Sequence, residues 1–381
     1  MSEIEIPRRM TAAVLTGSEP RLTTMEIDVP VPRAGEALVR MVACGVCHTD
    51  LHVMKGEVGF PRPAVMGHEI SGRIVSLGEG TADTRGLSVG DAVVGAFIMP
   101  CGTCAECERG RDDMCANFFA QNRLKGTLYD GESRLAMPDG SFLAMYSMGG
   151  LAEYAVVPLT ALVSLPAGLD PVAAAVLGCA AFTSYGAVNR AGQVQKGDVV
   201  AVVAVGGIGS GIIQTARAAG ADTVIAVDVA DDKLEAARAL GATHTVNSRE
   251  TDAVAAVRQI TGGRGVDVAF EALGRAETFQ QGVGMLADGG RMVAVGIAAG
   301  STVVPIEITP LVRRGYTIVG SFGARTREDL PAVVDLAARG GFDVDGLVTR
   351  RFPLEQADEA YQALARGEIT GRAVIDFGVE R

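Results

Sequence analysis

The chain has 381 residues, of which 48% are hydrophobic and 21% are charged, a globular composition that excludes a disordered chain. It carries 34 Lys and Arg against 45 Asp and Glu, a formal net charge of −11. That balance argues against nucleic acid or an anionic membrane as the main partner, because both attract clustered positive charge. The length predicts two or three compact units.

Neither a leader nor a membrane span is expected. Residues 1–9 are charged and lack the apolar stretch of a secretory signal. Two later segments, 171–188 and 199–213, are apolar, but glycine and hydroxyl residues interrupt them. Buried strand and helix explain them better than a membrane span, so we expect a cytoplasmic protein without a membrane partner.

The first half of the chain predicts a mainly β unit. Between residues 10 and 177, short apolar runs alternate with turn residues, as at 12–15, 37–43, 70–77 and 154–157. Residues 118–147 show little periodicity, which predicts a long loop over that unit.

After about residue 180, strands alternate with helices, which predicts a parallel, doubly wound sheet. The expected strands are 199–205, 223–227, 266–270, 292–295 and 316–319, and the clearest helices are 206–219 and 231–240. A final helix at 330–338 and short strand-like pieces follow, which could rejoin the first unit.

The first strand–helix turn of this region is a candidate dinucleotide site. A G-x-G-x-x-G fingerprint would need glycine at 204, 206 and 209, and the first position is Ala204. Alanine fits this turn if its φ is negative. Gly206 would let the backbone approach a pyrophosphate, and Gly209 would let helix and strand pack closely. Gly207 and Ile208 would open the helix, whose N-terminus offers N–H groups to phosphate.

Asp228 closes the second strand of the alternating region, 19 residues after Gly209. Its carboxylate would accept hydrogen bonds from ribose hydroxyls and repel a 2′-phosphate, so the sequence predicts NAD rather than NADP. The alternative interpretation is that Asp228 caps a helix at the strand end.

The cysteines point to metal. Seven cysteines in a chain without a signal are poor evidence for disulfides, and four of them follow the pattern C-x2-C-x2-C-x7-C. Four thiolates within 15 residues suit a tetrahedral structural zinc, and the spacing differs from that of an iron–sulfur cluster. The alternative is four unrelated buried cysteines. The predicted ligands are Cys101, Cys104, Cys107 and Cys115.

A second candidate metal set is dispersed along the chain. Cys47, His68 and Cys179 would form a Cys₂His set with a fourth position open for water or substrate. The rival interpretation is a redox pair, because Cys44 and Cys47 form C-x-x-C, although thioredoxin-like surroundings are absent. Three of the four histidines fall between residues 48 and 68, which favours chemistry in this segment.

Together these motifs resemble the zinc-dependent alcohol dehydrogenases of the medium-chain dehydrogenase/reductase superfamily, over essentially the whole chain. The resemblance implies an α/β fold with a GroES-like β-barrel catalytic domain, residues 1–180 and 325–381, that carries both zinc sites. Residues 181–324 would form a Rossmann domain with a doubly wound parallel sheet that binds NAD.

The resemblance also implies residue roles at the metal and in proton transfer. Cys47, His68 and Cys179 correspond to catalytic zinc ligands, the Cys₂His set known for alcohol dehydrogenases, and Glu69 to a transient ligand. Asp50 would orient the zinc histidine. Thr49 would pass the alcohol proton through the ribose towards His52.

Further residues correspond to positions that contact the cofactor or the substrate. His48 and Arg372 would face the pyrophosphate, and Lys233 the ribose. Thr183 would lie beside the nicotinamide, and Phe97 would line the substrate pocket. The set expected to bind the cofactor is His48, Thr183, Gly206, Gly207, Ile208, Gly209, Asp228, Lys233, Val295, Ile297 and Arg372.

The sequence therefore predicts reversible NAD-dependent oxidation of an alcohol, medium-chain or aromatic, with two zinc ions per chain and a homodimeric or homotetrameric assembly. The residues after Cys115 lack the arginine of glutathione-adduct enzymes, which disfavours that substrate. Two alternatives stay open. One is a zinc-free quinone or enone reductase of the same superfamily, and the other is a zinc-ribbon binding protein that senses NAD.

Overall fold

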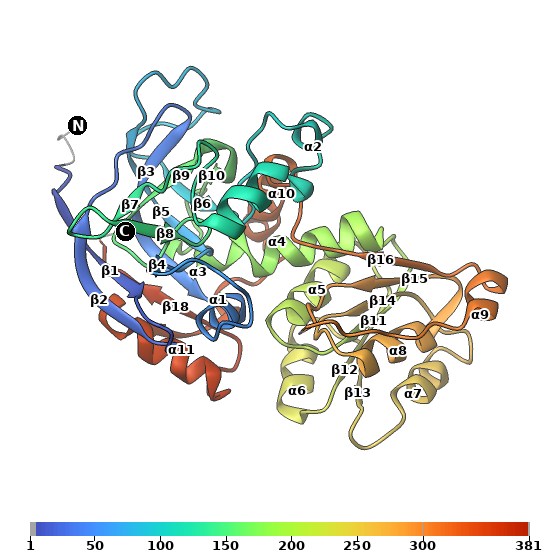
Figure 1. The fold of residues 1–381 in the computed structure, drawn as a ribbon. Helices are drawn as coiled ribbons and strands as arrows, with labels where there is room; N and C mark the ends of the chain where they lie inside the picture. The colour runs from blue at the N-terminus through green and yellow to red at the C-terminus, as the bar shows by residue number, and fades with distance from the viewer. Residues whose placement is uncertain (1–4, 299, 380–381) are drawn as a thin grey trace. The chain divides into compact units, whose positions relative to one another are not determined.

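The computed structural model describes residues 5–298 and 300–379, which divide into two compact units (Figure 1). The first unit comprises the described residues up to Cys179, then Arg325–Ala338 and those from Val344 onward. The second unit comprises Ala180–Ala324 and Arg339–Asp343. The chain thus leaves the first unit near residue 180, returns to it at residue 325, and leaves it again for the short segment Arg339–Asp343.

The described strands of the first unit form two sheets. One has the order β2 (Leu22–Asp28), β1 (Arg9–Leu15), β4 (Ala64–Val65), β8 (Phe142–Met145), β7 (Leu135–Ala136). The other has the order β10 (Leu162–Ser164), β6 (Ala92–Gly95), β5 (Ile70–Leu77), β3 (Glu36–Val46), β18 (Arg372–Asp376), β17 (Val348–Phe352), and β9 (Tyr154–Pro158) also pairs with β3. The mainly β character expected for this half of the chain is confirmed.

Strand β3 organises the first unit. It is buried at all but one of its positions, and it pairs antiparallel with β5, β9 and β18. The pairing with β18 places Ala373 opposite Val46, next to the residues that enter the site. The C-terminal strands therefore do rejoin the first unit, because β18 completes the hydrogen bonds of a strand more than 300 residues earlier.

Short helices connect the strands of the first unit. The α-helices are α1 (His48–Met54), α2 (Ala105–Glu108), α3 (Pro171–Ala174), α10 (Thr326–Ala338) and α11 (Ala357–Ala365). The 3-10 and π segments are η1 (Asp112–Met114), η2 (Phe118–Arg123), η3 (Leu159–Ala161), η4 (Ala175–Gly178), η6 (Asp345–Leu347) and η7 (Leu354–Gln356).

Two sequence expectations need correction here. Residues 118–147 are not one long loop, because they contain η2, β7 and β8, and β8 pairs with β4. Phe118 is fully buried, so this segment supplies part of the core. Helix α10 begins at Thr326 rather than at 330, since the Asp329 carboxylate accepts a hydrogen bond from the Arg325 N–H at 2.8 Å and holds its first turn.

The second unit contains the expected parallel sheet. Its order is β13 (His244–Asn247), β12 (Thr223–Asp228), β11 (Val199–Val203), β14 (Val266–Glu271), β15 (Leu286–Ala294), β16 (Thr317–Gly320). Its helices are α4 (Ala180–Tyr185), η5 (Gly186–Gly192), α5 (Gly207–Ala218), α6 (Asp231–Ala239), α7 (Ala253–Ile260), α8 (Ala276–Met285) and α9 (Ile308–Arg313). This strand order is that of a doubly wound dinucleotide-binding sheet.

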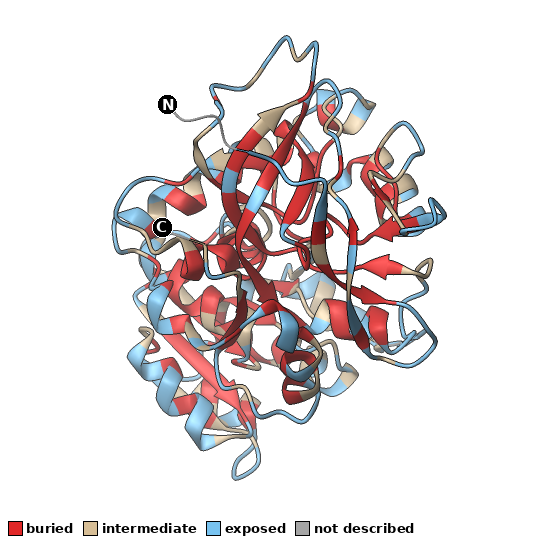
Figure 2. Ribbon diagram, turned by 90° about the vertical axis from the view of Figure 1, so that its left-hand side faces the viewer, coloured by how far each residue is buried: buried red, intermediate tan, exposed pale blue. Residues whose placement is uncertain are grey.

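Strand residues of the second unit alternate between two cores, as the pleat requires. Val200 and Val202 belong to the cluster that contains residues of α5 and α6. Ala201 and Val203 belong to the cluster that contains residues of α7 and α8. Figure 2 shows the resulting pattern, with buried strands and exposed outer helix faces.

Within the described residues, no single helix is long and apolar enough to cross a membrane; the bent pair Pro171–Gly178 and Ala180–Gly192 meets the length and composition criteria when taken together.

Candidate functional site

The first unit brings together four side chains that can hold a metal ion. Ligand atoms of Cys47, His68, Glu69 and Cys179 lie within 4.8 Å of one another, and all four residues are buried. Cys47 follows β3 and precedes α1, the pair His68 and Glu69 precedes β5, and Cys179 follows η4. The fold thus collects Cys47, His68 and Cys179, the three residues predicted from distant parts of the sequence.

Asp50 fixes the orientation of the His68 ring. Its Oδ1 lies 3.0 Å from His68 Nδ1 and also accepts from the Gly67 N–H at 3.3 Å. Its Oδ2 accepts from the Tyr361 hydroxyl at 2.9 Å. With Nδ1 engaged by Asp50, His68 presents Nε2 to the other ligands, and within the described residues this buried Nε2 has no hydrogen-bond partner. A buried acceptor without a partner, aimed at two thiols, fits a zinc ligand.

Tyr361 is a site residue that sequence reasoning missed. It lies in α11, fully buried, and its hydroxyl bonds to Asp50 across a separation of 311 residues. No local motif surrounds it, because its role depends only on the packing of α11 against α1. Its hydrogen bond completes a chain from Tyr361 through Asp50 to His68.

The electrostatics of the cluster favour a cation. The hydrogen bond from Cys179 lowers the pKa of Cys47 well below its usual value, and that same bond raises the pKa of Cys179. Burial alone would lower the pKa of His68, but the Asp50 carboxylate and the Cys47 thiolate raise it to about 9. The site therefore concentrates negative charge at sulfur, which suits a soft divalent ion.

Glu69 and Arg372 form a buried ion pair beside the cluster. Arg372, on β18, donates to Glu69 Oε1, while Glu69 Oε2 has no partner within the described residues. A Cβ at Gly45 would come within 2.0 Å of Glu69 Oε2, so only glycine leaves room for this carboxylate. Both residues were predicted for other contacts, Glu69 for the metal and Arg372 for pyrophosphate.

The residues expected to move the proton lie on α1. Thr49 Oγ1 lies 3.6 Å from Cys47 Sγ, which places this hydroxyl next to the metal cluster. His52 is exposed, and its Nδ1 contacts the Glu57 carboxylate. His48, at the start of the helix, is also exposed.

Aromatic side chains surround His68. The rings of Phe97 and Tyr146 each lie edge-on to the imidazole with centroids 6.0 Å away, and Phe60 lies 5.0 Å from Tyr146. Phe97 was predicted as a pocket residue. Tyr146 and Phe60 were missed, because neither stands near a recognisable motif.

A second group of side chains that could hold a metal ion lies in residues 101–115 of the first unit, here called the four-cysteine lobe. Ligand atoms of the four predicted residues lie within 4.8 Å of one another. Cys101 and Cys107 have Sγ atoms 4.0 Å apart, as do Cys104 and Cys115. Tetrahedral zinc–thiolate geometry requires about 3.8 Å between sulfurs. The spacing therefore fits one enclosed zinc ion.

Backbone N–H groups stabilise thiolates in this lobe. Cys101 Sγ accepts from the N–H groups of Thr103 at 3.4 Å and Cys104 at 3.3 Å. Burial raises the pKa of Cys101, but these donors outweigh it and lower the pKa to about 6. Burial raises the pKa of Cys107. The cysteines of the described chain are all free, so no disulfide competes for these sulfurs.

In the second unit, the glycine-rich turn opens α5. Ala204 has φ of +71°, so the negative φ under which alanine would fit this turn is not found. A Cβ at Gly209 would lie 2.1 Å from the Ala204 carbonyl oxygen, whereas nothing lies within 4 Å of one at Gly206. Gly206 is the exposed N-cap, with Gly207 and Ile208 in the first turn. The turn thus has the close packing at 209 and the open backbone at 206 that a phosphate site needs.

Asp228 is buried at the end of β12, where its carboxylate accepts hydrogen bonds from backbone N–H groups, including one at the start of the glycine turn. Oδ2 accepts from the Val205 N–H at 2.9 Å, and Oδ1 accepts from the N–H groups of Val229 at 2.8 Å and Ala230 at 3.2 Å. It therefore ties the glycine turn to the residues before α6. Each carboxylate oxygen can accept more than one hydrogen bond, so these contacts leave acceptor capacity for a ribose.

The other residues of the second unit that were expected to contact the cofactor lie on several different elements. Thr183 is buried in α4, and Lys233 is exposed on α6. Val295 follows β15, and Ile297 is 68% exposed.

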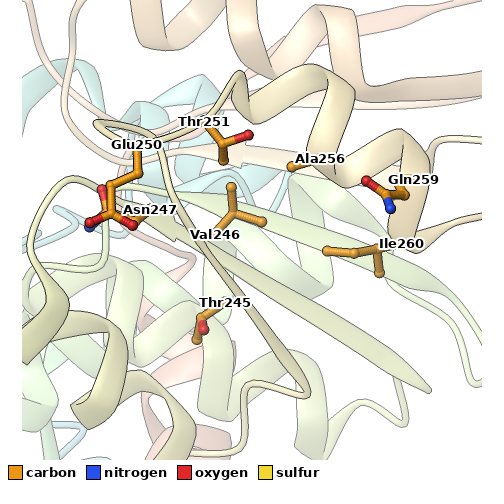
Figure 3. A pocket seen from close by; sticks show the side chains of 8 residues that line it. All are labelled: Thr245, Val246, Asn247, Glu250, Thr251, Ala256, Gln259 and Ile260. Atoms are coloured by element: carbon orange, nitrogen blue, oxygen red, sulfur yellow. The ribbon is translucent and has the colours of Figure 1, made fainter.

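A pocket of about 680 Å³ lies between β13 and α7. The residues that line it, drawn in Figure 3, are Thr245, Val246, Asn247, Glu250, Thr251, Ala256, Gln259 and Ile260. None of the predicted site residues lines it.

Comparison with known proteins gives a consistent result over both units. Residues 33–167 match the family model described as alcohol dehydrogenase GroES-like domain, and residues 207–339 match that described as zinc-binding dehydrogenase. The chain is 33% identical over 374 residues to a probable S-(hydroxymethyl)glutathione dehydrogenase 1 of Schizosaccharomyces pombe, covering 96% of each chain.

Two further relatives extend this result. Identity is 35% over 365 residues to putative alcohol dehydrogenase D of Mycobacterium tuberculosis, covering 94% of this chain and 98% of the relative. The crystal structure of benzyl alcohol dehydrogenase from Acinetobacter calcoaceticus superposes with a TM-score of 0.89 at 31% identity, covering 97% of this chain and 99% of the other.

Proposed function

Because the chain belongs to the zinc-type alcohol dehydrogenases of the medium-chain dehydrogenase/reductase superfamily, we propose that it catalyses reversible, NAD-dependent oxidation of an alcohol to an aldehyde or ketone. The observation that carries this proposal is the buried set Cys47, His68 and Cys179, with His68 Nε2 unpartnered among the described residues. Three ligands leave one position open for substrate, as in catalytic zinc sites.

Each chain would hold two zinc ions. Cys47, His68 and Cys179 would hold the catalytic ion, with Glu69 as a transient ligand. Cys101, Cys104, Cys107 and Cys115 would enclose the structural ion. When bound, the catalytic zinc polarises the alcohol oxygen as a Lewis acid and NAD accepts the hydride.

The chain's own residues orient the metal ligand and move the proton. Asp50 holds the His68 ring through Nδ1, and Tyr361 holds Asp50. The Thr49 hydroxyl, beside Cys47, would accept the proton of the alcohol and release its own proton towards the ribose and His52. The Glu57 carboxylate contacts His52 Nδ1.

NAD is the preferred cofactor in this proposal. The Asp228 carboxylate supports it, because a 2′-phosphate beside a buried carboxylate would be repelled. The glycine turn at 206–209 would bind the pyrophosphate, with His48 and Arg372. Lys233 would contact the ribose, while Thr183, Val295 and Ile297 would contact the nicotinamide half.

A medium-chain or aromatic alcohol is the proposed substrate. The rings of Phe97 and Tyr146 around His68 support it, since they offer apolar contact next to the reacting carbon. The similarity to a benzyl alcohol dehydrogenase points the same way.

We also propose that the chain acts as a homo-oligomer in the cytoplasm. Strand β16 lies at the edge of its sheet, and the chain that precedes it carries large exposed apolar side chains, namely Ile297, Val303, Ile308 and Val312. Exposed apolar side chains and a strand edge both favour self-association. Free cysteines throughout the described chain fit a reducing compartment.

The test is zinc stoichiometry measured together with alcohol-dependent NADH formation on the purified protein. Two zinc ions per chain with turnover of an alcohol panel would support the proposal. Turnover of quinones or enones without zinc would favour the reductase alternative. One zinc ion without turnover would favour a binding protein.

A further inference from the structure

Arg123 is a partly buried arginine near the metal cluster that the proposed mechanism does not use. It ends η2, the π-helical segment Phe118–Arg123. The preceding residue, Asn122, is fully buried and donates to the carbonyl groups of Thr127, Met145 and Ser147 at 3.0–3.4 Å. These bonds fix the backbone from which the Arg123 side chain extends.

The Arg123 side chain covers the aromatic wall of the site. Its guanidinium carbon lies 4.5 Å from the ring centroid of Tyr146. Its Nη1 donates a hydrogen bond to the Tyr146 hydroxyl. The Tyr146 ring lies 6.0 Å from the His68 ring. The guanidinium carbon therefore lies no farther from the centroid of the His68 ring than the sum of these two distances. A small substrate can span that separation.

The structure gives Arg123 no carboxylate partner among the described residues. Within the described residues, no carboxylate lies within salt-bridge distance of it, and its one protein hydrogen bond is to a neutral phenol. Three other partly or fully buried arginines of this unit are paired with carboxylates: Arg134 with Glu36, Arg327 with Asp112 and Arg372 with Glu69. A guanidinium has five N–H donors, so Arg123 retains several for a ligand.

We infer that Arg123 binds a carboxylate on the substrate, so that the preferred alcohol is a hydroxy acid whose carboxylate lies several atoms from the carbinol carbon. This inference rests on the proposed alcohol oxidation and adds the class of substrate. Guanidinium and carboxylate match in shape and charge. A local cation is needed, because the whole chain carries a net charge of −11 and repels anions.

The test compares two alcohols with the same number of heavy atoms, with NAD as cofactor: 4-(hydroxymethyl)benzoate and the neutral 4-(hydroxymethyl)benzamide. The readout is the ratio of their kcat/KM values in the parent protein, Arg123→Gln, Arg123→Lys and Lys125→Gln. Lys125 is the matched control, because it is exposed, two residues away, and its replacement removes the same charge.

We expect the parent to prefer the carboxylate by about 10- to 100-fold, chiefly through KM, and this preference to weaken with added salt. Arg123→Gln should bring the ratio near one, Arg123→Lys should restore part of it, and Lys125→Gln should retain it. A ratio near one in the parent, or one that Arg123→Gln leaves unchanged, overturns the inference. If neither alcohol is oxidised by the zinc-loaded parent, it is the proposed function that fails.

Discussion

Asp50 occupies a central position among the site residues, because both of its carboxylate oxygens are engaged by groups from different elements. It receives hydrogen bonds from Gly67 and from Tyr361, and it contacts His68 Nδ1. Such an outer carboxylate fixes the ring orientation and tautomer of a metal-binding histidine. The precision of the metal cluster therefore depends on residues that do not contact the metal.

Replacing Thr49 and replacing His68 should impair the protein in different ways if their proposed roles are correct. Thr49→Ala should keep two zinc ions and NAD affinity while losing most alcohol oxidation, because the proton acceptor next to Cys47 is gone. Thr49→Ser, which keeps the hydroxyl, should retain much of the activity. Metal analysis, NAD titration and initial rates measure these outcomes.

His68→Ala should instead lose one zinc ion per chain and nearly all activity, because three ligands become two. Parent-level oxidation by Thr49→Ala near neutral pH would contradict the proton path and leave the zinc assignment standing. Two retained zinc ions in His68→Ala would contradict the zinc assignment.

Ala204 has a backbone conformation that favours glycine. Its φ of +71° costs an L-residue about 1 kcal/mol relative to glycine. We therefore expect Ala204→Gly to raise the free energy of unfolding by about 1 kcal/mol, measured by chemical denaturation.

The control is Ala236→Gly, at an exposed position within α6, which should lower stability by a similar amount. Lower stability in both variants would show that the turn is not strained in solution.

Asp228 should determine the choice between NAD and NADP. Replacing it should also destabilise the glycine turn that it supports. The parent should use NAD with kcat/KM roughly 100-fold above that for NADP, since a buried carboxylate repels the 2′-phosphate. Asp228→Asn should narrow this gap, chiefly by weakening NAD, and lower stability because the amide supplies one acceptor oxygen where the Val205 and Val229 N–H groups now use two. Equal use of both cofactors by the parent would argue against the assignment.

Among the elements, the four-cysteine lobe has little secondary structure of its own. It contains α2 of four residues and η1 of three, with the cysteines at or next to their ends. Outside the metal set, Arg327 of α10 connects the lobe to the rest of the first unit by binding Asp112 and the Cys107 carbonyl. An element so short needs a metal and such a tether to stay ordered.

Removing one lobe ligand should therefore unfold the lobe locally. We expect Cys104→Ser to bind one zinc ion rather than two and to show a lower Tm by scanning calorimetry, because zinc binding contributes to folding of this lobe. Arg327→Gln should retain both zinc ions and lose less stability. A Cys104→Ser protein with two zinc ions and the parent Tm would refute a structural zinc here.

For the molecule as a whole, the second unit leaves an edge strand uncovered. Strand β16 pairs with β15 on one side, and Ile308 and Val312 lie one turn apart on α9, 74% and 72% exposed. Within a single copy these side chains cost solvation free energy that a second copy would recover.

Charge on this patch should weaken self-association. We expect Val312→Asp to shift the protein to a smaller assembly in light scattering coupled to size-exclusion chromatography, because a carboxylate opposes burial at an apolar interface. Val31→Asp is the control, since Val31 is 77% exposed in the first unit. A monomeric parent, or an unchanged mass for Val312→Asp, would contradict the proposed oligomer.

Several features of this protein follow from the sequence alone, because they depend on neighbours along the chain. The alternating strands and helices predict the parallel sheet, whereas its strand order is known only from the structure. The four-cysteine spacing predicts a compact metal lobe, since its ligands lie within 15 residues. The dispersed set Cys47, His68 and Cys179 was a candidate from its ligand types, and the family resemblance assigned its role, because no local spacing joins these residues.

Other features were decided by tertiary structure, because they join residues far apart in the sequence. Tyr361 reaches Asp50 across 311 residues, and Arg372 reaches Glu69 across 303. The sequence of residues 118–147 predicts a loop, but in the structure β8 of this segment pairs with β4. Arg123, at the end of η2, lies against the Tyr146 ring. Local sequence encodes periodicity and ligand spacing, whereas contacts that complete buried charges and hydrogen bonds arise only when the packed elements meet.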